Sequence, residues 1–255
     1  MTEDDQVVIY RVDSDVARVT LNRPDKRNAL NEELIAGLKD SLGKAHRDDR
    51  VRAVILNGSG QDFCSGADLS ALQKISTANV AENLDDARSL MELFVLMRNV
   101  RVPIIAAVTG RALAGGCGLA TSCDLVLASE SARFGYPEVR IGFVPAMVMA
   151  ILRRNVSEKR AFELITSGDE VDAYQAKELG LVNQVFGDDT FLNDVETYVR
   201  RYSKTSKTAV ALTKKLLYQI DSLAFAESLE TGLDVNVIAR MTSDCQQGIA
   251  KFLKK

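Results

Sequence analysis

Three short segments of the chain carry residue types that could do chemistry. The first, residues 61–69 (QDFCSGADL), follows a short apolar run and precedes a helical stretch. Small residues around Gly66 allow a ligand to approach the backbone closely, and the N–H of Ala67 could point outward at a helix N-terminus. The alternative is a turn in which Asp68 caps the helix. The segment alone favours neither interpretation.

The second segment, residues 109–119 (TGRALAGGCGL), is rich in glycine and follows another apolar run. It does not match a phosphate-binding P-loop, because Gly116 stands where that motif has lysine. It does not match a dinucleotide fingerprint, because Thr121 stands where the third glycine belongs. A helix start with uncovered N–H groups remains, and this suits an oxyanion. Tight packing of a helix on a sheet is the competing explanation.

The third segment, residues 134–145 (FGYPEVRIGFVP), places Glu138 in a largely apolar stretch between two prolines. Desolvation there would raise the pKa of the carboxyl group, as a general acid–base near neutral pH requires. An exposed loop acid, or an ion-pair partner for Arg140, is the alternative.

The single histidine, His46, lies at the polar end of a predicted helix, which disfavours a histidine-dependent hydrolase. Acid–base work therefore falls to carboxylates, lysine or tyrosine.

Apolar patterning indicates the elements that must position these segments. We expect a helix capped by Asn31 that runs to residue 46, and a second amphipathic helix over residues 82–99. The expected strands are residues 7–12 and 16–21, joined as a hairpin, and residues 53–56, 104–108, 125–128 and 182–186. Strands separated by helices favour the α/β class with a mainly parallel sheet. The pattern predicts an α/β domain over residues 1–200 and a helical region over residues 201–255.

The composition excludes several classes of protein. The 255 residues are 46% hydrophobic, which supports a large core, and the net charge of −3 disfavours nucleic acid as a partner. The acidic N-terminal sequence has no targeting pattern, and the richest apolar run, residues 102–108, is far shorter than the ~18 residues of a membrane span. Four cysteines without CxxC spacing disfavour a zinc site and indicate reduced thiols. We therefore expect a cytoplasmic protein without a membrane partner.

Taken in order and spacing, these segments resemble the crotonase superfamily, the enoyl-CoA hydratase/isomerase family, over nearly the whole chain. The resemblance rests on five motifs in register. They are Asn22-Arg23-Pro24 with Asn28-Ala29-Leu30, residues 63–69, residues 107–124, residues 134–142, and Gly248-Ile249 with Phe252-Leu253.

The resemblance implies a spiral of ββα turns, a C-terminal helical region used for trimerisation, and an acyl-CoA thioester as substrate. The expected assembly is a homotrimer or a dimer of trimers. No metal and no cofactor are implied, because CoA is part of the substrate. Two backbone N–H groups, which map onto Ala67 and Gly115, would hold the thioester oxygen as enolate character develops. The other implied substrate-binding positions are Lys26, Arg27, Ala29, Ser65, Asp68, Leu69, Gly116 and Pro137.

One departure from the family pattern bears on the reaction. Family hydratases usually carry two catalytic glutamates, of which one maps onto Glu138 and the other onto Gly118. A single carboxylate suits the 1,3-proton shuttle of a Δ3,Δ2-enoyl-CoA isomerase. Hydration with one glutamate would need backbone groups or Tyr136 to hold the water.

A finer resemblance favours hydration. Residues 83–88, 116–119 and 138–146 are similar to a bacterial methylglutaconyl-CoA hydratase-like subgroup that also lacks the first glutamate. We therefore expect reversible hydration of a 2-enoyl-CoA, with Glu138 as the catalytic acid–base. The alternatives are the isomerase, a thioester hydrolase or decarboxylase on the same fold, and a non-catalytic protein that binds CoA thioesters.

Overall fold

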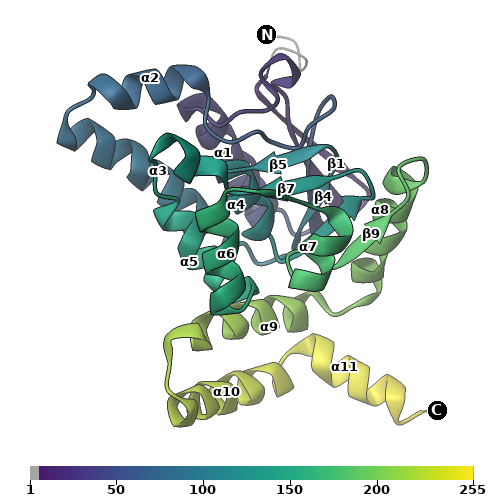
Figure 1. Ribbon diagram of the computed structural model, residues 1–255. Coiled ribbons are helices and arrows are strands. Elements are labelled where there is room, and N and C mark those ends of the chain that lie inside the picture. Colours follow the sequence, from purple (N-terminus) through teal and green to yellow (C-terminus); the bar gives the residue numbers. More distant parts are fainter. Residues whose placement is uncertain (1–5, 255) are drawn as a thin grey trace.

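The computed structural model describes residues 6–254, and its strands form two sheets (Figure 1). The larger sheet has the order β1-β2-β3-β4-β6-β9. Its strands are β1 (Val8–Asp13), β2 (Val16–Leu21), β3 (Ala53–Gly58), β4 (Ile104–Val108), β6 (Leu125–Ser129) and β9 (Gln184–Phe186). Strands β1 and β2 form the expected antiparallel hairpin, and every later neighbour pairs in parallel. The prediction of a mainly parallel α/β core is confirmed.

Helices bury both faces of this sheet, as the continuous apolar runs of its central strands predict. Val54 and Leu56 of β3 point into a cluster with helices α1 (Glu32–Arg47) and α3 (Val80–Asn99). Ala53 and Ile55 point to the opposite face, where α8 (Phe191–Val199) covers them. The sheet is therefore a rigid layer between helices, and its strand ends can hold loops in fixed positions.

The smaller sheet contains three strands of three residues each, and the sequence pattern did not predict them. It has the order β5-β7-β8, with β5 (Arg111–Leu113), β7 (Arg133–Gly135) and β8 (Glu170–Asp172). Strands β5 and β7 are parallel, and β8 is antiparallel to β7. The helices around this sheet are α4 (Gly115–Thr121), η3 (Pro137–Ile141), α5 (Ala146–Asn155), α6 (Glu158–Ser167) and α7 (Ala173–Leu179). This sheet and its helices position two of the three candidate segments.

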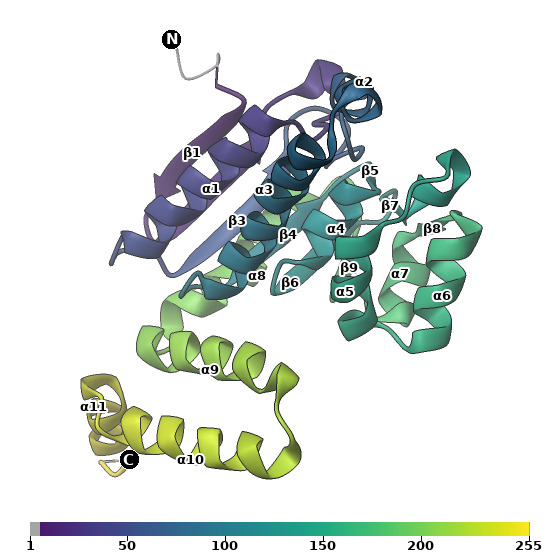
Figure 2. The same cartoon turned by 90° about the vertical axis from the view of Figure 1, so that its left-hand side faces the viewer.

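The C-terminal region is helical, as expected, and extends away from the two sheets (Figure 2). Its main helices are α9 (Lys207–Gln219), α10 (Phe225–Arg240) and α11 (Ser243–Phe252), with η4 (Arg200–Lys204) and η5 (Ile220–Ser222) between longer elements. Helix α9 packs on α3, whereas α10 packs on α9 and α11 packs on both. The helices α10 and α11 thus lie beyond α9 rather than on the core.

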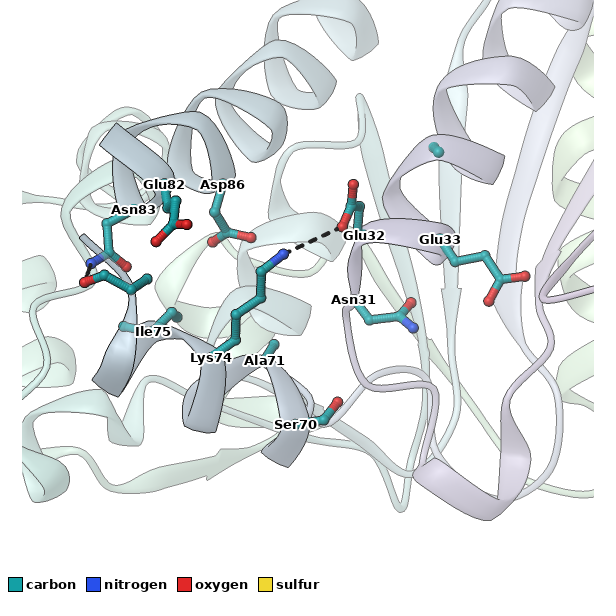
Figure 3. A pocket seen from close by; sticks show the side chains of 12 residues that line it. Asn31, Glu32, Glu33, Ser70, Ala71, Lys74, Ile75, Glu82, Asn83 and Asp86 are labelled. Atoms are coloured by element: carbon teal, nitrogen blue, oxygen red, sulfur yellow. Dashed lines mark hydrogen bonds and ion pairs between the residues drawn. The ribbon is translucent and has the colours of Figure 1, made fainter. Parts of the chain in front are cut away.

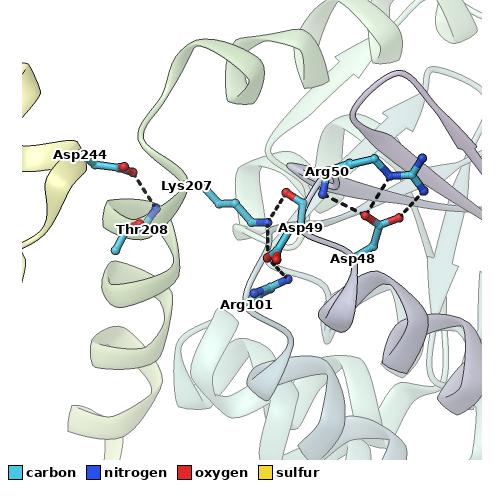
Figure 4. Close-up of polar contacts among 7 residues, drawn as sticks. All are labelled: Asp48, Asp49, Arg50, Arg101, Lys207, Thr208 and Asp244. Carbon is cyan, nitrogen blue, oxygen red and sulfur yellow. Dashed lines mark hydrogen bonds and ion pairs between the residues drawn. The ribbon is translucent and has the colours of Figure 1, made fainter.

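Polar contacts attach α9 to the core and α11 to α9 (Figure 4). Lys207 donates to the carbonyl oxygen of Asp49 at 2.6 Å, and Arg101 donates to the Asp49 carboxylate at 2.8 Å. On the opposite side of α9, the carboxylate of Asp244 accepts a hydrogen bond from the N–H of Thr208 at 3.3 Å. The start of α9 is therefore one of the points at which the helical region joins the core. Among residues 6–254, no helix is long and apolar enough to cross a membrane.

Candidate active site

Parallel pairing brings the three candidate segments to one edge of the small sheet. Cys64 pairs in parallel with Ala112 of β5, and Ala112 pairs in parallel with Phe134 of β7. Parallel segments end at the same edge, so the residues that follow them emerge together. Ala67 and Gly115 lie three positions beyond their paired residues, and Glu138 lies four beyond Phe134. Sequence segments far apart in the chain are thus brought together as predicted.

The N–H of Ala67 is directed by the two hydrogen bonds on either side of it. Leu30 donates to the carbonyl of Gly66 at 2.7 Å and accepts from the N–H of Asp68 at 2.9 Å. In a parallel bridge of this kind, the N–H and C=O of the residue between them point away from the paired chain. Within residues 6–254 the Ala67 N–H has no acceptor, and Ala67 is exposed. This N–H is available to a ligand.

The N–H of Gly115 is the first in helix α4 and also has no acceptor among the described residues. Ala114, which precedes it, adopts φ +50° and donates to the carbonyl of Gly135 at 2.8 Å. A positive φ is strained for alanine, and such strain persists where the surroundings hold the backbone in place. The next residue, Gly116, cannot carry a side chain, because a Cβ would lie 2.2 Å from the carbonyl oxygen of Cys64. The helix start therefore presents bare backbone.

Gly66 allows the N–H groups of Ala67 and Gly115 to lie close together. It adopts φ +98°, and a Cβ built on it would lie 2.8 Å from Cβ of Ala114 and 3.7 Å from the nitrogen of Gly115. Only glycine allows the loop of Ala67 to approach the α4 start this closely. Two N–H groups from separate segments at this spacing form an oxyanion hole if both face one ligand oxygen.

Glu138 lies in η3, immediately after β7, and is half-buried. Its Oε2 atom is buried without a hydrogen-bond partner among residues 6–254. Burial raises the pKa of this carboxyl group. A buried carboxylate oxygen without a partner is costly unless a ligand or water completes it. The direction of this shift is the one that desolvation was expected to produce at Glu138.

Tyr136 does not reach the position where a water could be held, contrary to the sequence-based hypothesis. Its side chain is fully buried, and its hydroxyl lies 3.4 Å from Oγ1 of Thr121. Burial, together with the neighbouring Cys117, raises the pKa of Tyr136 well above its usual value. The Tyr136 hydroxyl is therefore held inside the core.

Gly118 lies on the buried side of α4 against α5. A Cβ at this position would lie 2.7 Å from Cγ2 of Val148, which is itself buried. The space that a side chain at residue 118 would need is filled by valine. Gly118 itself supplies no carboxylate.

The loop that precedes Asn31 lies against the Ala67 segment. Lys26 and Arg27 are exposed, whereas Ala29 is buried. The carbonyl of Arg27 accepts from the N–H of Ser65 at 3.0 Å. Two cationic side chains thus lie in solvent beside the segment that carries Ala67, which is the position expected for contact with CoA phosphates.

Asp68 is held by protein groups instead of facing a ligand. It accepts from the N–H and hydroxyl of Ser70 at 2.9 and 2.8 Å, and from Arg23 at 2.6 Å. The Ser70 hydrogen bonds and the Arg23 ion pair lower the pKa of Asp68 to about 2. Its role as cap of α2 (Leu69–Thr77) is confirmed. Leu69 is the first residue of α2, and its side chain lies outside the described part of the structure. Pro137, another predicted substrate-binding residue, is the first residue of η3.

Two cavities lie elsewhere. One of about 640 Å³ lies between α1, α2 and α3 and is lined by four carboxylates and by Lys74, whose ammonium is 3.6 Å from Glu32 (Figure 3). Its acidic lining does not suit CoA phosphates. The other, of about 680 Å³, lies between α3 and α9. Among residues 6–254, no group of three or more His, Cys, Asp or Glu side chains could hold a metal ion.

Three residues near the site were not singled out as functional from the sequence: Arg23, Asn28 and Val148. Arg23 and Asn28 were visible only as parts of a motif. Their contacts are made with residues about 30 to 45 positions away, so local patterning carries no signal for them. For Val148, the glycine at residue 118 was the available hint.

The chain is similar to known proteins in sequence and in fold. The enoyl-CoA hydratase/isomerase family model matches residues 11–255. A Thermus thermophilus protein named "Putative enoyl-CoA hydratase" is 40% identical over 240 residues, which cover 94% of this chain and 95% of the relative. The 2,3-dehydroadipyl-CoA hydratase of Escherichia coli is 34% identical over 94% of this chain and 92% of its own.

Solved structures agree as well. The crystal structure of an enoyl-CoA hydratase from Mycobacterium smegmatis superposes with a TM-score of 0.93 and 30% identity, covering 97% of this chain and 96% of that one. The expected crotonase-like α/β fold with a C-terminal helical region is therefore confirmed. The chain belongs to the enoyl-CoA hydratase/isomerase family, that is, to the crotonase superfamily.

Proposed function

We propose that this chain catalyses the reversible hydration of a 2-enoyl-CoA thioester, with Glu138 as its single acid–base. One observation carries the proposal. The uncommitted N–H groups of Ala67 and Gly115 emerge at the same sheet edge as the unpartnered Oε2 of Glu138. An oxyanion hole beside a desolvated carboxylate is the arrangement that an enolate-forming reaction requires.

The mechanism follows from these groups. The thioester oxygen accepts hydrogen bonds from Ala67 and Gly115. Ionised Glu138 removes a proton from water, the hydroxide bonds to the β-carbon, and the electron pair of the double bond moves to the thioester oxygen as an enolate. Protonated Glu138 then returns the proton to the α-carbon, and the carbonyl re-forms. One water is added, and Glu138 ends as it began. Each N–H donor contributes about 3–4 kcal/mol at the transition state.

The CoA portion of the substrate lies along the loop before Asn31 in this proposal. Lys26 and Arg27 supply cationic side chains for its phosphates, and Ala29, Ser65 and Leu69 lie along the path toward Ala67. The backbone of Gly116 and Pro137 lies beside the reacting carbons. Asp68 acts on the substrate only through its neighbours, because its carboxylate is committed to Arg23 and Ser70.

A panel of acyl-CoA thioesters analysed by mass spectrometry tests the proposal. Hydration adds the mass of one water, whereas isomerisation leaves the mass unchanged. The panel includes crotonyl-CoA, a 3-enoyl-CoA, and two dicarboxylic substrates, methylglutaconyl-CoA and 2,3-dehydroadipyl-CoA. We expect water addition that Glu138→Gln abolishes. If no thioester changes in mass or bond position while CoA esters still bind, the protein is a non-catalytic binder.

A Δ3,Δ2-enoyl-CoA isomerase is the second candidate, and Gly118 favours it. Without a second carboxylate, one group must move every proton, which a 1,3-shuttle on the substrate does without water. The two candidates differ in whether water enters the site. Uptake of ¹⁸O from labelled water into the product separates them.

We further propose that the chain assembles as a homotrimer or a dimer of trimers through residues 201–255. On α10 and at the residue that follows its last turn, five apolar side chains recur at every fourth position and are exposed. They are Phe225, Leu229, Leu233, Val237 and Met241. A stripe of this size on one helix is typical of a surface that another subunit covers. Light scattering at micromolar concentration tests this: a trimer or hexamer is expected, and Leu229→Glu/Leu233→Glu should yield monomers whereas Glu230→Gln should not.

A further inference from the structure

The motif Asn22-Arg23-Pro24…Asn28 has no role in the proposed chemistry, yet the guanidinium of Arg23 is directed at the segment that carries Ala67. One guanidinium nitrogen of Arg23 donates to the carbonyl of Ala29 at 2.5 Å, and another donates to Asp68 Oδ2 at 2.6 Å. Only 15% of the Arg23 side chain and 9% of the Asp68 side chain are exposed. A partly buried, two-pronged arginine contact fixes geometry more strongly than a surface ion pair does.

Asn28 completes the connection between the two loops. It is fully buried at φ +54°, and its amide donates to the carbonyls of Ser59 and Asp62 at 2.9 and 2.8 Å. Its amide oxygen accepts from the N–H of Arg23 at 2.9 Å. The backbone of Arg23 is thus fixed by Asn28, while its guanidinium contacts both Ala29 and Asp68.

The contacts reach Ala67 from both sides. Leu30, next to Ala29, makes the two backbone hydrogen bonds to Gly66 and Asp68 that direct the Ala67 N–H. Arg23 holds Ala29 and Asp68, the residues adjacent to this bridge. Loss of the Arg23–Asp68 ion pair would therefore let the Ala67 N–H rotate or shift.

We propose that the Arg23–Asp68 ion pair is a positioning device for the oxyanion hole, which fixes the Ala67 N–H against the thioester oxygen through the Leu30 bridge. The inference rests on the proposed function and adds two positioning residues to it. Neither side chain touches the substrate. A displacement of about 1 Å at a reacting group costs as much as 10²-fold in rate.

The test uses Asp68→Asn and Arg23→Lys in the full-length protein. Asparagine keeps an acceptor for Ser70 but loses the charge, and lysine keeps the charge but cannot contact Ala29 and Asp68 together. We expect kcat for crotonyl-CoA to fall about 10- to 100-fold in each variant, with KM changed less than about threefold. The double variant Arg23→Lys/Asp68→Asn should lose little more than either single variant, because both remove one interaction.

A spectroscopic readout separates positioning from mere stability. Bound butyryl-CoA labelled with ¹³C at its carbonyl reports the strength of the oxyanion hole by its infrared stretching frequency. The parent should lower this frequency relative to solution, Glu138→Gln should keep the lowering, and Asp68→Asn and Arg23→Lys should lose most of it. Glu92→Gln is the control, since it breaks an ion pair of Lys39 between α1 and α3 and should change neither readout.

The outcomes are distinct. If the variants raise KM and keep both kcat and the carbonyl shift, Asp68 contacts the substrate and the inference is wrong. A fall in kcat with an unchanged carbonyl shift also overturns it. If Asp68→Asn does not fold, Arg23→Lys decides, because it retains the charge and the cap of α2. A parent that neither hydrates an enoyl-CoA nor shifts the carbonyl would instead refute the proposed function.

Discussion

Val148 fills the space that a side chain at residue 118 would occupy, with its Cγ2 only 2.7 Å from the position of a Cβ on Gly118. Gly118→Ala should therefore destabilise the protein by about 1–3 kcal/mol despite the higher helix propensity of alanine. Chemical denaturation should show that Val148→Ala in the same chain recovers most of this loss, because the two changes are coupled.

The same contact determines how a second carboxylate could be introduced. Gly118→Glu alone should fold poorly, whereas Gly118→Glu/Val148→Gly provides space for the side chain. In the double variant we expect water addition to increase relative to isomerisation, measured by product mass. Val148→Gly alone is the control, and equal product ratios in the two would contradict the assignment of this position.

Gly115 allows the oxyanion hole to be tested with little change to the fold. Residue 115 is the first of α4, where proline is tolerated because its missing N–H has no intrahelical partner. Gly115→Pro should lower kcat about 10²- to 10³-fold. Gly115→Ala adds a Cβ near Cδ1 of Leu30 but keeps the N–H, so its turnover should stay close to the parent's. Equal turnover in both variants, with parental melting curves, would reject this donor.

The sequence predicted those parts of the fold that depend on local signals. Asn31 accepts from the N–H of Leu34, and Asp68 accepts from the N–H of Ser70, so both helix caps are where the polar residues indicated. The buried strands of the larger sheet were predicted from continuous apolar runs. The strands β5, β7 and β8 were not, because each has three residues without a longer apolar run around them that would mark a strand.

The site was predictable only to the extent that its motifs are local. Glycine-rich backbone and a carboxylate in an apolar stretch pointed to Ala67, Gly115 and Glu138. The pairing of Asp68 with Arg23 and the packing of Val148 on Gly118 join chain segments about 30 to 45 residues apart. Such contacts depend on the tertiary fold, which single-sequence patterns do not specify.

Ala114 stores backbone strain beside the oxyanion hole. At φ +50°, alanine is disfavoured by about 1–3 kcal/mol, and glycine is not. Ala114→Gly should raise the free energy of unfolding by about 1 kcal/mol after the entropy gained by the unfolded chain is subtracted. Ala150→Gly, at a helical position in α5, should lower it by about 1 kcal/mol. Urea titrations of the two variants should thus shift in opposite directions.

Glu138→Gln should separate activity from stability along the pH axis. Because burial raises the pKa of Glu138, the folded protein binds this proton more tightly than the unfolded chain does, so ionising it costs stability as pH rises through the folded-state pKa. The variant should be more stable than the parent at pH 8, and the difference should vanish below the unfolded-state pKa of 4.5.

Turnover should fall about 10²- to 10⁴-fold in the Glu138→Gln variant. In the parent, kcat/KM should decline as pH drops below the raised pKa. Glu163→Gln, at an exposed position, should show neither effect. A variant as active as the parent would mean that another group carries the proton, and a variant less stable than the parent at pH 8 would contradict the raised pKa of Glu138.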